Sequence, residues 1–484
     1  MDKKEYKRLV TEYVKQLKGK KSNILLILTD DQGYGDLSFK NANKDVETPN
    51  IDRLRASGVF FENGYVTAPI CSPSRAGLIV GNYQRRWGAK WFGNSSFAPD
   101  KYLTIPELLK PQGYKAGYFG KVHYGADPLG SRSMPENHGF DDCLYGVASH
   151  SFGRLHYLEH AVNAIEKFGP EAHYLGKYPL YDNGKPVDCN RHLALEFTDR
   201  ALNFIDKVKD ENPFFCMLAY NSVHNFTWQL PNEILEKFNL PKHPDLDLSK
   251  EDYMVWYEDV IAPNLEYGRQ YYLAQLYILD QQIGRILDYL EENSLREDTI
   301  IIYLTDNGGS MCNYGSNTPL DGRKYTLYEG GIRVPYIVSW PGVIEANTSS
   351  EALVSSLDIL PTCTFLAGVD ESTYQTDGKN LLEVLLKDRG HENLFFDSGF
   401  QQAMRQGNWK MRYVDDSPDS LNARKGILKT EHTDIGEPGY TLVNFENGLD
   451  ESKEADLSKQ EPEKLKELQK EYQDWLDRMD RDEH

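Results

Sequence analysis

The chain has 484 residues, of which 40% are hydrophobic, so it can bury a large core. Its formal net charge of -20 at pH 7 disfavours nucleic acid or an anionic membrane surface as the main partner. The six cysteines are scattered and form no CxxC pair, so neither a zinc site nor a disulfide framework is indicated.

The start of the chain carries no export signal, because Met1 is followed by charged residues rather than by an apolar run. No segment approaches the roughly 20 apolar residues of a membrane-spanning helix. We therefore expect a cytoplasmic protein as the sequence stands. A start engineered to replace a removed signal peptide would look the same, and the protein would then be periplasmic.

The first predicted strand, residues 23–29, is a continuous apolar run, which is typical of a strand covered on both faces in a parallel sheet. It ends in Asp30 and Asp31. Ligands of open α/β sheets collect at the carboxyl ends of strands, so two adjacent carboxylates here could hold a hard cation. The alternative is a helix-capping aspartate with a solvated neighbour.

The stretch Cys71-Ser72-Pro73-Ser74-Arg75 predicts a tight turn that leads into a helix beginning near Ser74. Cys71 would then lie at a helix N-terminus, where unpaired N–H groups and the helix dipole favour an anion. Arg75, one turn further on, adds a fixed positive charge. The alternative is a small buried cysteine in a turn.

The next segment, residues 83–97, is rich in tryptophan, arginine and asparagine. Such a loop could stack on a sugar ring and hydrogen-bond to it, or it could pack against the core, and the sequence favours neither. The candidate substrate contacts in this segment are Arg85, Arg86, Trp87, Lys90 and Trp91.

Two further predicted strands lead into polar side chains. Residues 114–120 precede Lys121 and His123, which could both face one oxyanion. Residues 213–220 precede His224, although a lone histidine after a strand is more often structural than catalytic. Between these strands, residues 143–195 have no firm periodicity and are predicted to form an insertion over the site.

A long helix is predicted over residues 271–292, followed by a strand at 299–304 that leads into Asp306 and Asn307. These side chains again follow the carboxyl end of a strand. If their oxygens converge with those of Asp30 and Asp31, the site would suit calcium, which prefers several oxygen ligands.

Beyond about residue 370 the pattern changes to short strand-like pieces between polar turns, which predicts a small antiparallel sheet. Glu461-Pro462 then opens a helix with its apolar residues on one face. We therefore divide the chain into a large domain, residues 1–368, and a small C-terminal α+β subdomain, residues 369–484.

Several of these segments resemble motifs of one enzyme family. Cys71-x-Pro-x-Arg, followed by Ala-Gly-Leu, is similar to the signature of the formylglycine-dependent (type I) sulfatases of the alkaline-phosphatase-like superfamily, which include bacterial glycan sulfatases. Gly120-Lys-Val-His stands where the family carries Gly-Lys-Trp-His. The run that begins at Lys324 contains Lys-x-Thr, Glu-Gly-Gly and Arg-Val-Pro, as the family's does. The resemblance extends from about Asn23 to about Asp456.

The resemblance implies an α/β fold with a large mixed, mostly parallel sheet between helices and a smaller C-terminal antiparallel sheet plus helix. It also implies that a maturation enzyme oxidises Cys71 to formylglycine and that the site holds Ca²⁺. The catalytic residues implied are Cys71, Arg75, Lys121, His123, His224 and Lys324. The metal ligands implied are Asp30, Asp31, Cys71 in its modified form, Asp306 and Asn307.

The function implied is hydrolysis of a sulfate ester on a sulfated mono- or oligosaccharide, through a formylglycine gem-diol and a sulfo-enzyme intermediate. His224 would be the acid for the leaving group, and His123 would then help to release sulfate. Two alternatives stay open. Some phosphonate and phosphate ester hydrolases of the superfamily carry the same cysteine signature, and a relative could bind sugar or calcium without catalysis.

Overall fold

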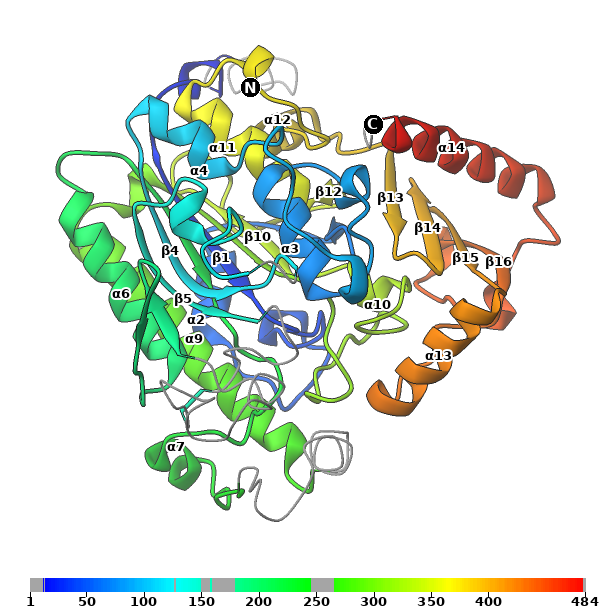
Figure 1. Cartoon of the computed structure of the whole chain (residues 1–484), viewed down its shortest axis with the longest axis horizontal. Coiled ribbons are helices and arrows are strands. Elements are labelled where there is room, and N and C mark those ends of the chain that lie inside the picture. The colour runs from blue at the N-terminus through cyan, green and yellow to red at the C-terminus, as the bar shows by residue number, and fades with distance from the viewer. Residues whose placement is uncertain are drawn as a thin grey trace.

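The computed structural model describes residues 12, 14–125, 128–148, 157–158, 179–244 and 265–481. Its main feature is a ten-stranded sheet with helices on both faces, beside a separate four-stranded antiparallel sheet near the C-terminus (Figure 1). The predicted α/β class with a smaller C-terminal sheet is confirmed.

Four parallel strands form the centre of the large sheet. In spatial order they are β9 (Thr299–Thr305), β1 (Asn23–Thr29), β8 (Phe214–Ala219) and β4 (Lys115–Val122). Successive residues of β1 point to opposite faces, so Leu25 and Ile27 join one hydrophobic cluster while Leu26 and Leu28 join another. The apolar run is therefore buried on both sides, and the carboxyl ends of all four strands meet at one edge.

Shorter strands extend the sheet at both sides. Beyond β9 lie β10 (Tyr336–Ser339), β2 (Gly58–Phe61) and β11 (Thr348–Ser350), and beyond β4 lie β5 (Asp142–Val147), β6 (Leu180–Asp182) and β7 (Lys185–Val187). The segment 143–195, predicted as an insertion, thus contributes strands to the sheet, and α6 (Leu193–Val208) begins at its end. Its residues 149–156 and 159–178 lie outside the described part of the chain.

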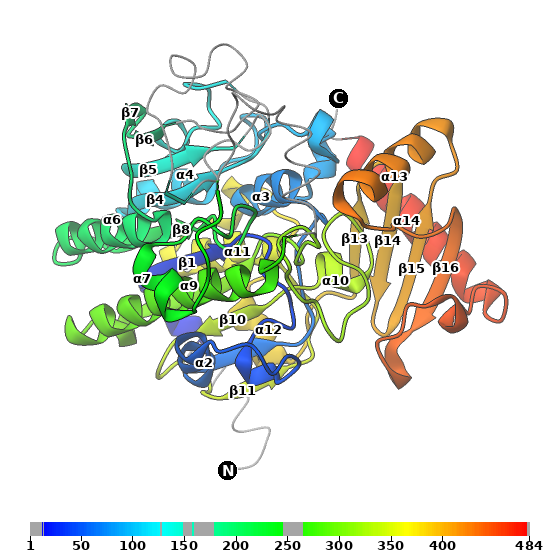
Figure 2. The ribbon, with the colours of Figure 1, turned by 90° about the horizontal axis from the view of Figure 1, so that it is seen from below.

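Helices cover the two faces of the sheet (Figure 1, Figure 2). On the face of Leu25 pack residues of α2 (Pro49–Ala56), α6 and α9 (Gly268–Glu292). On the face of Leu26 pack residues of α3 (Cys71–Val80), α4 (Ile105–Leu109), α11 (Ile359–Ala367) and α12 (Leu381–Lys387). The short α7 (Asn232–Lys237) adds Leu235 to the first of these clusters.

The C-terminal sheet has its own core. Its strands, in order, are β13 (Asn393–Asp397), β14 (Gln401–Gln406), β15 (Trp409–Val414) and β16 (Gly439–Asn444). Phe395, Met404, Met411 and Leu442 are neighbours across these strands and form one apolar row. Helix α14 (Pro462–Asp480) covers this row with Leu468, Tyr472, Trp475 and Met479, as its predicted apolar face requires, and Figure 2 shows α13 (Pro418–Glu431) on the opposite face.

The division of the chain after residue 368 stays a prediction. Helix α12 lies after this boundary, yet its Leu381, Leu382 and Val384 pack in the same cluster as α11 of the large sheet layer. The four-stranded sheet begins only at Asn393. Packing therefore assigns α12 to the larger unit.

Buried charges join the small sheet to the large one. Glu329, at the start of α10 (Glu329–Ile332), and Lys410 of β15 are both fully buried, with Oε1 and Nζ 2.9 Å apart. The Lys410 ammonium also lies 2.9 Å from Glu451 Oε1. Burial alone would raise the pKa of Glu329, but Lys410, Arg405 and Arg333 outweigh it and lower the pKa to about 2. The glutamate of the Glu-Gly-Gly motif is thus ionised and joins α10, the helix before β10 of the large sheet, to the small sheet.

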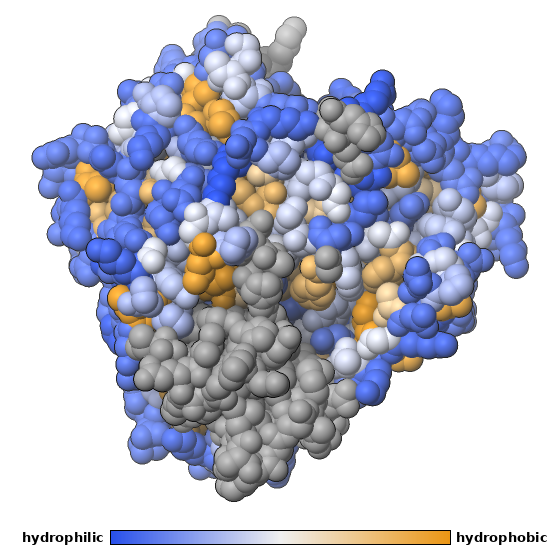
Figure 3. Space-filling view, viewed as in Figure 1, coloured by the Kyte–Doolittle hydropathy of each residue, from blue (hydrophilic) through white to orange (hydrophobic). Residues whose placement is uncertain are grey.

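The face seen in Figure 3 is mostly hydrophilic, with small separate hydrophobic patches. Among the described residues, no helix is both long enough and apolar enough to cross a membrane.

Candidate active site

The carboxylates predicted to converge do so at the carboxyl edge of the large sheet. β1 and β9 are parallel with Thr29 opposite Thr305, so the residues that follow each strand meet. The Asp31 N–H donates to Asp306 Oδ1 over 3.3 Å. Asn307 Nδ2 donates to Asp31 Oδ1 over 2.7 Å.

The loop after Asn307 depends on glycine. A Cβ added to Gly308 would lie 1.7 Å from the carbonyl oxygen of Gly330 in the Glu-Gly-Gly motif. Only glycine permits this approach of two backbones, because any other side chain would clash with the carbonyl. Two sequence motifs that are distant along the chain therefore pack directly against each other.

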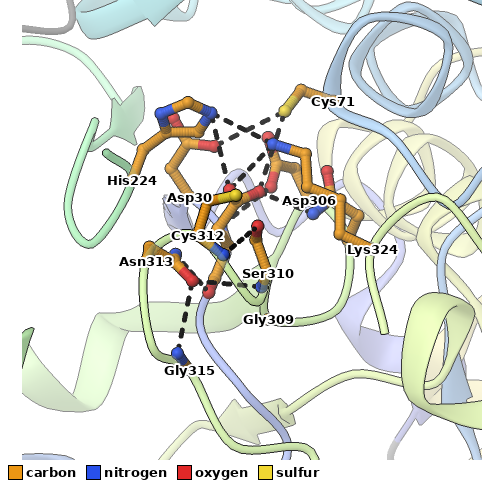
Figure 4. A network of polar contacts seen from close by, with 12 residues as sticks. Asp30, Cys71, His224, Asp306, Gly309, Ser310, Cys312, Asn313, Gly315 and Lys324 are labelled. Atoms are coloured by element: carbon orange, nitrogen blue, oxygen red, sulfur yellow. Dashed lines mark hydrogen bonds and ion pairs between the residues drawn. The ribbon is translucent and has the colours of Figure 1, made fainter. Parts of the chain in front are cut away.

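Cys71 lies at the N-terminus of a helix that points into this group. Helix α3 begins at Cys71 itself, earlier than the predicted start near Ser74, and places Pro73 in its first turn. The Cys71 Sγ lies 3.6 Å from Asp30 Oδ1 and 3.9 Å from Asp31 Oδ1. Figure 4 shows Cys71 beside Asp30 and Asp306. Burial and the Asp306 charge raise the pKa of the Cys71 thiol, so the unmodified side chain is a poor nucleophile.

Each of the three carboxylates has its own cation. Lys121 Nζ lies 2.7 Å from Asp30 Oδ2, and Lys324 Nζ lies 2.8 Å from Asp31 Oδ2. Arg75 Nε lies 2.6 Å from Asp306 Oδ2, and its Nη1 donates to the Lys121 carbonyl oxygen over 3.1 Å. All these side chains are buried, so mutual pairing offsets the cost of desolvating them. The formal charges of the six groups cancel, so the site can take up a dication together with an anionic ester.

The donor atoms fit a calcium ion. Burial, and then the Asp306 charge, raise the pKa of Asp30 to about 7 even though Lys121 and Arg75 oppose the shift. A cation between these carboxylates would stabilise the ionised form of Asp30, which burial and the Asp306 charge disfavour. Asn307 Oδ1 is buried and has no hydrogen-bond partner among the described residues. Carboxylate and amide oxygens are the ligands that Ca²⁺ prefers.

His224 and Lys324 form a hydrogen-bonded pair beside the carboxylates. His224 Nε2 lies 3.0 Å from Lys324 Nζ and 3.4 Å from Asp31 Oδ2. Burial, Lys324 and Lys121 lower the pKa of His224. The imidazole is therefore neutral here, with Nε2 accepting from the lysine. The ligand atoms of Asp30, Asp31, Cys71 and His224 all lie within 4.8 Å of one another, so His224 belongs to the site.

His123 also borders the site. Burial and the charges of Lys121, Arg75 and Lys324 lower its pKa, so it too is neutral. Its Nδ1 is buried without a partner among the described residues. The ring of Phe92 stacks on the His123 ring, with centroids 6.4 Å apart and an interplanar angle of 20°.

Two arginines of the 83–97 segment, Arg85 and Arg86, form ion pairs with aspartates, and their predicted role as sugar contacts stays a prediction. Arg86 binds both oxygens of Asp377, with Nη2 2.6 Å from Oδ1. Arg85 Nε lies 3.0 Å from Asp397 Oδ2, and the same guanidinium pairs with Asp480 of α14. These cations therefore attach the 83–97 segment to the C-terminal part of the chain.

The tryptophans and Lys90 of the segment also pack against protein groups. Trp87 Nε1 donates to the Ser96 carbonyl oxygen over 3.0 Å, and its ring lies 5.5 Å from that of Tyr102. Lys90 Nζ lies 3.7 Å from Asp397 Oδ2.

An aromatic group that includes Trp91 lies beside the site. Trp91 meets Phe400 edge to face, with centroids 4.8 Å apart, and Tyr325 at 6.2 Å. Phe92, which the sequence did not single out, is 42% exposed while it stacks on His123. Its position next to Trp91 in an aromatic segment was the only available signal for it.

Comparison with known proteins agrees with this geometry. A family model described as Sulfatase matches residues 22–369. The human N-acetylgalactosamine-6-sulfatase is 31% identical over 386 residues, which cover 76% of this chain and 66% of that protein. An arylsulfatase of Hemicentrotus pulcherrimus is 30% identical over 81% of this chain and 67% of its own length. The chain thus spans about two thirds of the length of these relatives.

A solved structure shares the architecture over nearly the whole chain. The crystal structure of Ps i-CgsB in complex with k-i-k-neocarrahexaose superposes with a TM-score of 0.76 at 28% identity. The match covers 94% of this chain and 92% of that one, so it includes the C-terminal sheet. The paired carboxylates, the helix-terminal cysteine and the matching family model together assign the chain, which belongs to the sulfatase family.

Proposed function

We propose that this protein hydrolyses sulfate esters of a mono- or oligosaccharide. The observation that carries the proposal is the position of Cys71, within 3.6 Å of Asp30 and 3.9 Å of Asp31 at the N-terminus of α3. Relatives support the sugar class, since one is an N-acetylgalactosamine-6-sulfatase and another was solved in complex with k-i-k-neocarrahexaose.

Two groups would complete the chemistry. Conversion of Cys71 to formylglycine by a maturation enzyme would supply a hydrated aldehyde, whose hydroxyl is a far better nucleophile than the buried thiol. Calcium held by Asp30, Asp31, Asp306 and Asn307, together with the modified residue 71, would supply positive charge for the sulfate oxygens.

The chain's own cations hold and polarise the ester. Lys121 and Lys324 donate hydrogen bonds to sulfate oxygens as negative charge moves onto them. Arg75 fixes Asp306 through its 2.6 Å ion pair and so keeps the carboxylates in place beside residue 71. Because these groups are buried and already oriented, they need little reorganisation when the ester binds.

The His224 and Lys324 pair handles the proton of the leaving group. A negatively charged ester beside Nε2 raises the affinity of His224 for a proton from solvent, while Lys324, whose Nζ lies 3.0 Å away, keeps its own proton and its charge. The protonated imidazole then donates to the sugar oxygen as the bond to sulfur breaks. His123, which is neutral and whose Nδ1 has no hydrogen-bond partner among the described residues, accepts the proton whose removal lets sulfate leave.

A substrate panel tests the proposal. Protein coexpressed with a formylglycine-generating enzyme is assayed against sulfated mono- and oligosaccharides, nitrophenyl sulfate, and the corresponding phosphate and phosphonate esters. We expect sulfate release with Ca²⁺ present. Faster turnover of phosphate or phosphonate esters would assign the protein to the other reaction class, and sugar binding without any turnover would make it a binding protein.

A further inference from the structure

Arg323, directly before Lys324, has no counter-ion among the described residues. Arg75, Lys121 and Lys324 each face a carboxylate within 2.8 Å. Arg323, by contrast, forms no ion pair with any described carboxylate, and its Nη1 lies 2.9 Å from the Met311 sulfur. A thioether is only a weak hydrogen-bond acceptor.

Burying the Arg323 guanidinium without an anionic partner costs free energy in the absence of a ligand. Arg323 is half-buried, so its guanidinium has lost part of its hydration. Burial lowers the pKa of Arg323, because desolvation disfavours the charged guanidinium. A guanidinium presents a planar set of N–H donors that matches a carboxylate or a sulfate at two points. An anionic group of a ligand would provide the partner that the described part of the chain does not.

The backbone holds Arg323 at the edge of the ester site. Its N–H donates to Thr326 Oγ1 over 3.1 Å, and that hydroxyl donates back to the Arg323 carbonyl oxygen over 2.7 Å. The N–H of Lys324 donates to the Gly309 carbonyl oxygen over 3.2 Å. This turn fixes the position of Arg323 next to the lysine that pairs with Asp31.

The partners of the Arg323 side chain belong to the same site. Met311 and Cys312 precede Asn313, whose Nδ2 donates to the Asp31 carbonyl oxygen over 3.2 Å. Burial and the Glu431 carboxylate raise the pKa of Cys312, and the nearby Lys324 opposes the shift. Figure 4 shows Cys312, Asn313 and Lys324 in the same network of polar contacts as Asp30 and Asp306. The guanidinium thus contacts the Met311–Asn313 loop, which borders the ester site, and takes no part in the three ion pairs of that site.

We propose that Arg323 binds a second anionic group of the substrate, a carboxylate or a further sulfate near the sulfate that is removed. The inference rests on the proposed sulfatase function and narrows its substrate class. Substrates with two acidic groups would then be preferred over sugars that carry a single sulfate.

Three sugar probes test the proposal. They are a galactosamine with one sulfate, the same sugar with two sulfates, and the singly sulfated sugar joined to a uronic acid. In Arg323→Met we expect KM to rise about tenfold for at least one doubly charged probe, because a charge-assisted pair is lost. For the singly sulfated probe we expect less than a twofold change. Whichever doubly charged probe responds identifies the second group as sulfate or carboxylate.

Two controls separate this effect from a general one. Arg323→Lys keeps the charge and should retain part of the preference. Arg53→Met removes the same charge from an exposed pair with Asp288 and Glu291 on the outside of α2, and should leave all three KM values unchanged. Titration calorimetry measures the binding affinity of the same sugars in the absence of turnover. It compares Cys71→Ser protein with the double variant Cys71→Ser, Arg323→Met.

The outcomes distinguish the two proposals. If the converted protein hydrolyses nitrophenyl sulfate but Arg323→Met changes all sugar probes equally or none of them, the second-anion proposal is wrong and the proposed function stands. If the converted protein hydrolyses no sulfate ester at all, the proposed function itself fails.

Discussion

The Arg86 guanidinium and the Asp377 carboxylate form a two-point ion pair, with Nε 2.8 Å from Oδ2 and Nη2 2.6 Å from Oδ1. The two side chains are only 10% and 14% exposed, and they are 291 residues apart in the chain. The pair ties the segment after α3 to the loop between α11 and α12, and this relationship changes what substitution of Arg86 should do.

We predict that Arg86→Ala lowers stability rather than substrate affinity. Asp377 would keep the Tyr83 N–H as a donor but lose its charged partner, so the free energy of unfolding should fall by about 2 kcal/mol. The midpoint of urea unfolding measures this. Arg53→Ala, which breaks an exposed pair, is the matched control and should change little. A raised KM for sugar at unchanged stability would support the sugar-contact interpretation.

Substitution of Phe92, unlike that of Arg86, should lower the affinity for substrate and leave the stability of the fold unchanged. Its ring is 42% exposed and stacks on His123, so it can also stack on a sugar ring bound at the site. We expect Phe92→Ala to raise KM for a sulfated sugar several-fold more than for nitrophenyl sulfate, with an unchanged melting temperature. Steady-state kinetics give KM and kcat of the variant for both substrates, and thermal unfolding gives its melting temperature. Equal losses on both would mean that the ring only positions His123.

Cys71→Ser should abolish turnover without unfolding the protein, when it is made in a host that lacks the serine-type maturation system. Serine is slightly smaller than cysteine and can donate to Asp30 as the thiol does. Mass spectrometry of active wild-type protein should show residue 71 about 18 Da lighter than cysteine, the difference between a thiol and a formyl group. Full activity in protein whose Cys71 is entirely unmodified would contradict the formylglycine mechanism.

Calcium should stabilise the protein as well as activate it. The Asp30, Asp31 and Asp306 carboxylates lie together, and burial already raises the pKa of Asp30 to about 7. Added Ca²⁺ should therefore raise the melting temperature, and chelation should lower both melting temperature and activity. Asp31→Asn keeps the shape but removes a charge, and it should weaken both responses. An active enzyme after exhaustive removal of metal would show that these aspartates are not ligands.

Stability should decrease in mildly acidic solution because of two buried histidines. Burial lowers the pKa of His192 to about 4 and that of His138 to about 3, from the ordinary 6.5. Below about pH 6.5 the unfolded chain binds these protons and the folded protein does not. Each histidine should then reduce the free energy of unfolding by about 1.4 kcal/mol per pH unit, down to its folded pKa.

Urea unfolding between pH 7.5 and 5 measures this slope. His192→Gln, which can still donate to Gln275, removes one titrating group and should make the slope shallower. An unchanged slope in this variant would show that His192 is protonated in the folded state.

The sequence alone determined the elements that depend on neighbours in the chain. The apolar run of β1, the turn that brings Cys71 to the start of α3 and the one-sided apolar pattern of α14 are all local, because side-chain periodicity follows the geometry of one element. The convergence of Asp30 with Asp306 also followed from the sequence, since parallel strands place their carboxyl ends at one edge.

Only the tertiary structure decided which distant charges meet. Nothing in the local sequence distinguishes Arg86, which pairs with Asp377, from Arg323, which pairs with no described carboxylate. The same holds for Glu329 of α10, whose partner Lys410 comes from β15 of the C-terminal sheet. The physical reason is that local periodicity encodes whether a side chain is buried, whereas the partner of a buried charge is fixed by how separate elements pack. The charges that form ion pairs within this protein and the charge that we propose binds a ligand therefore look alike in the sequence.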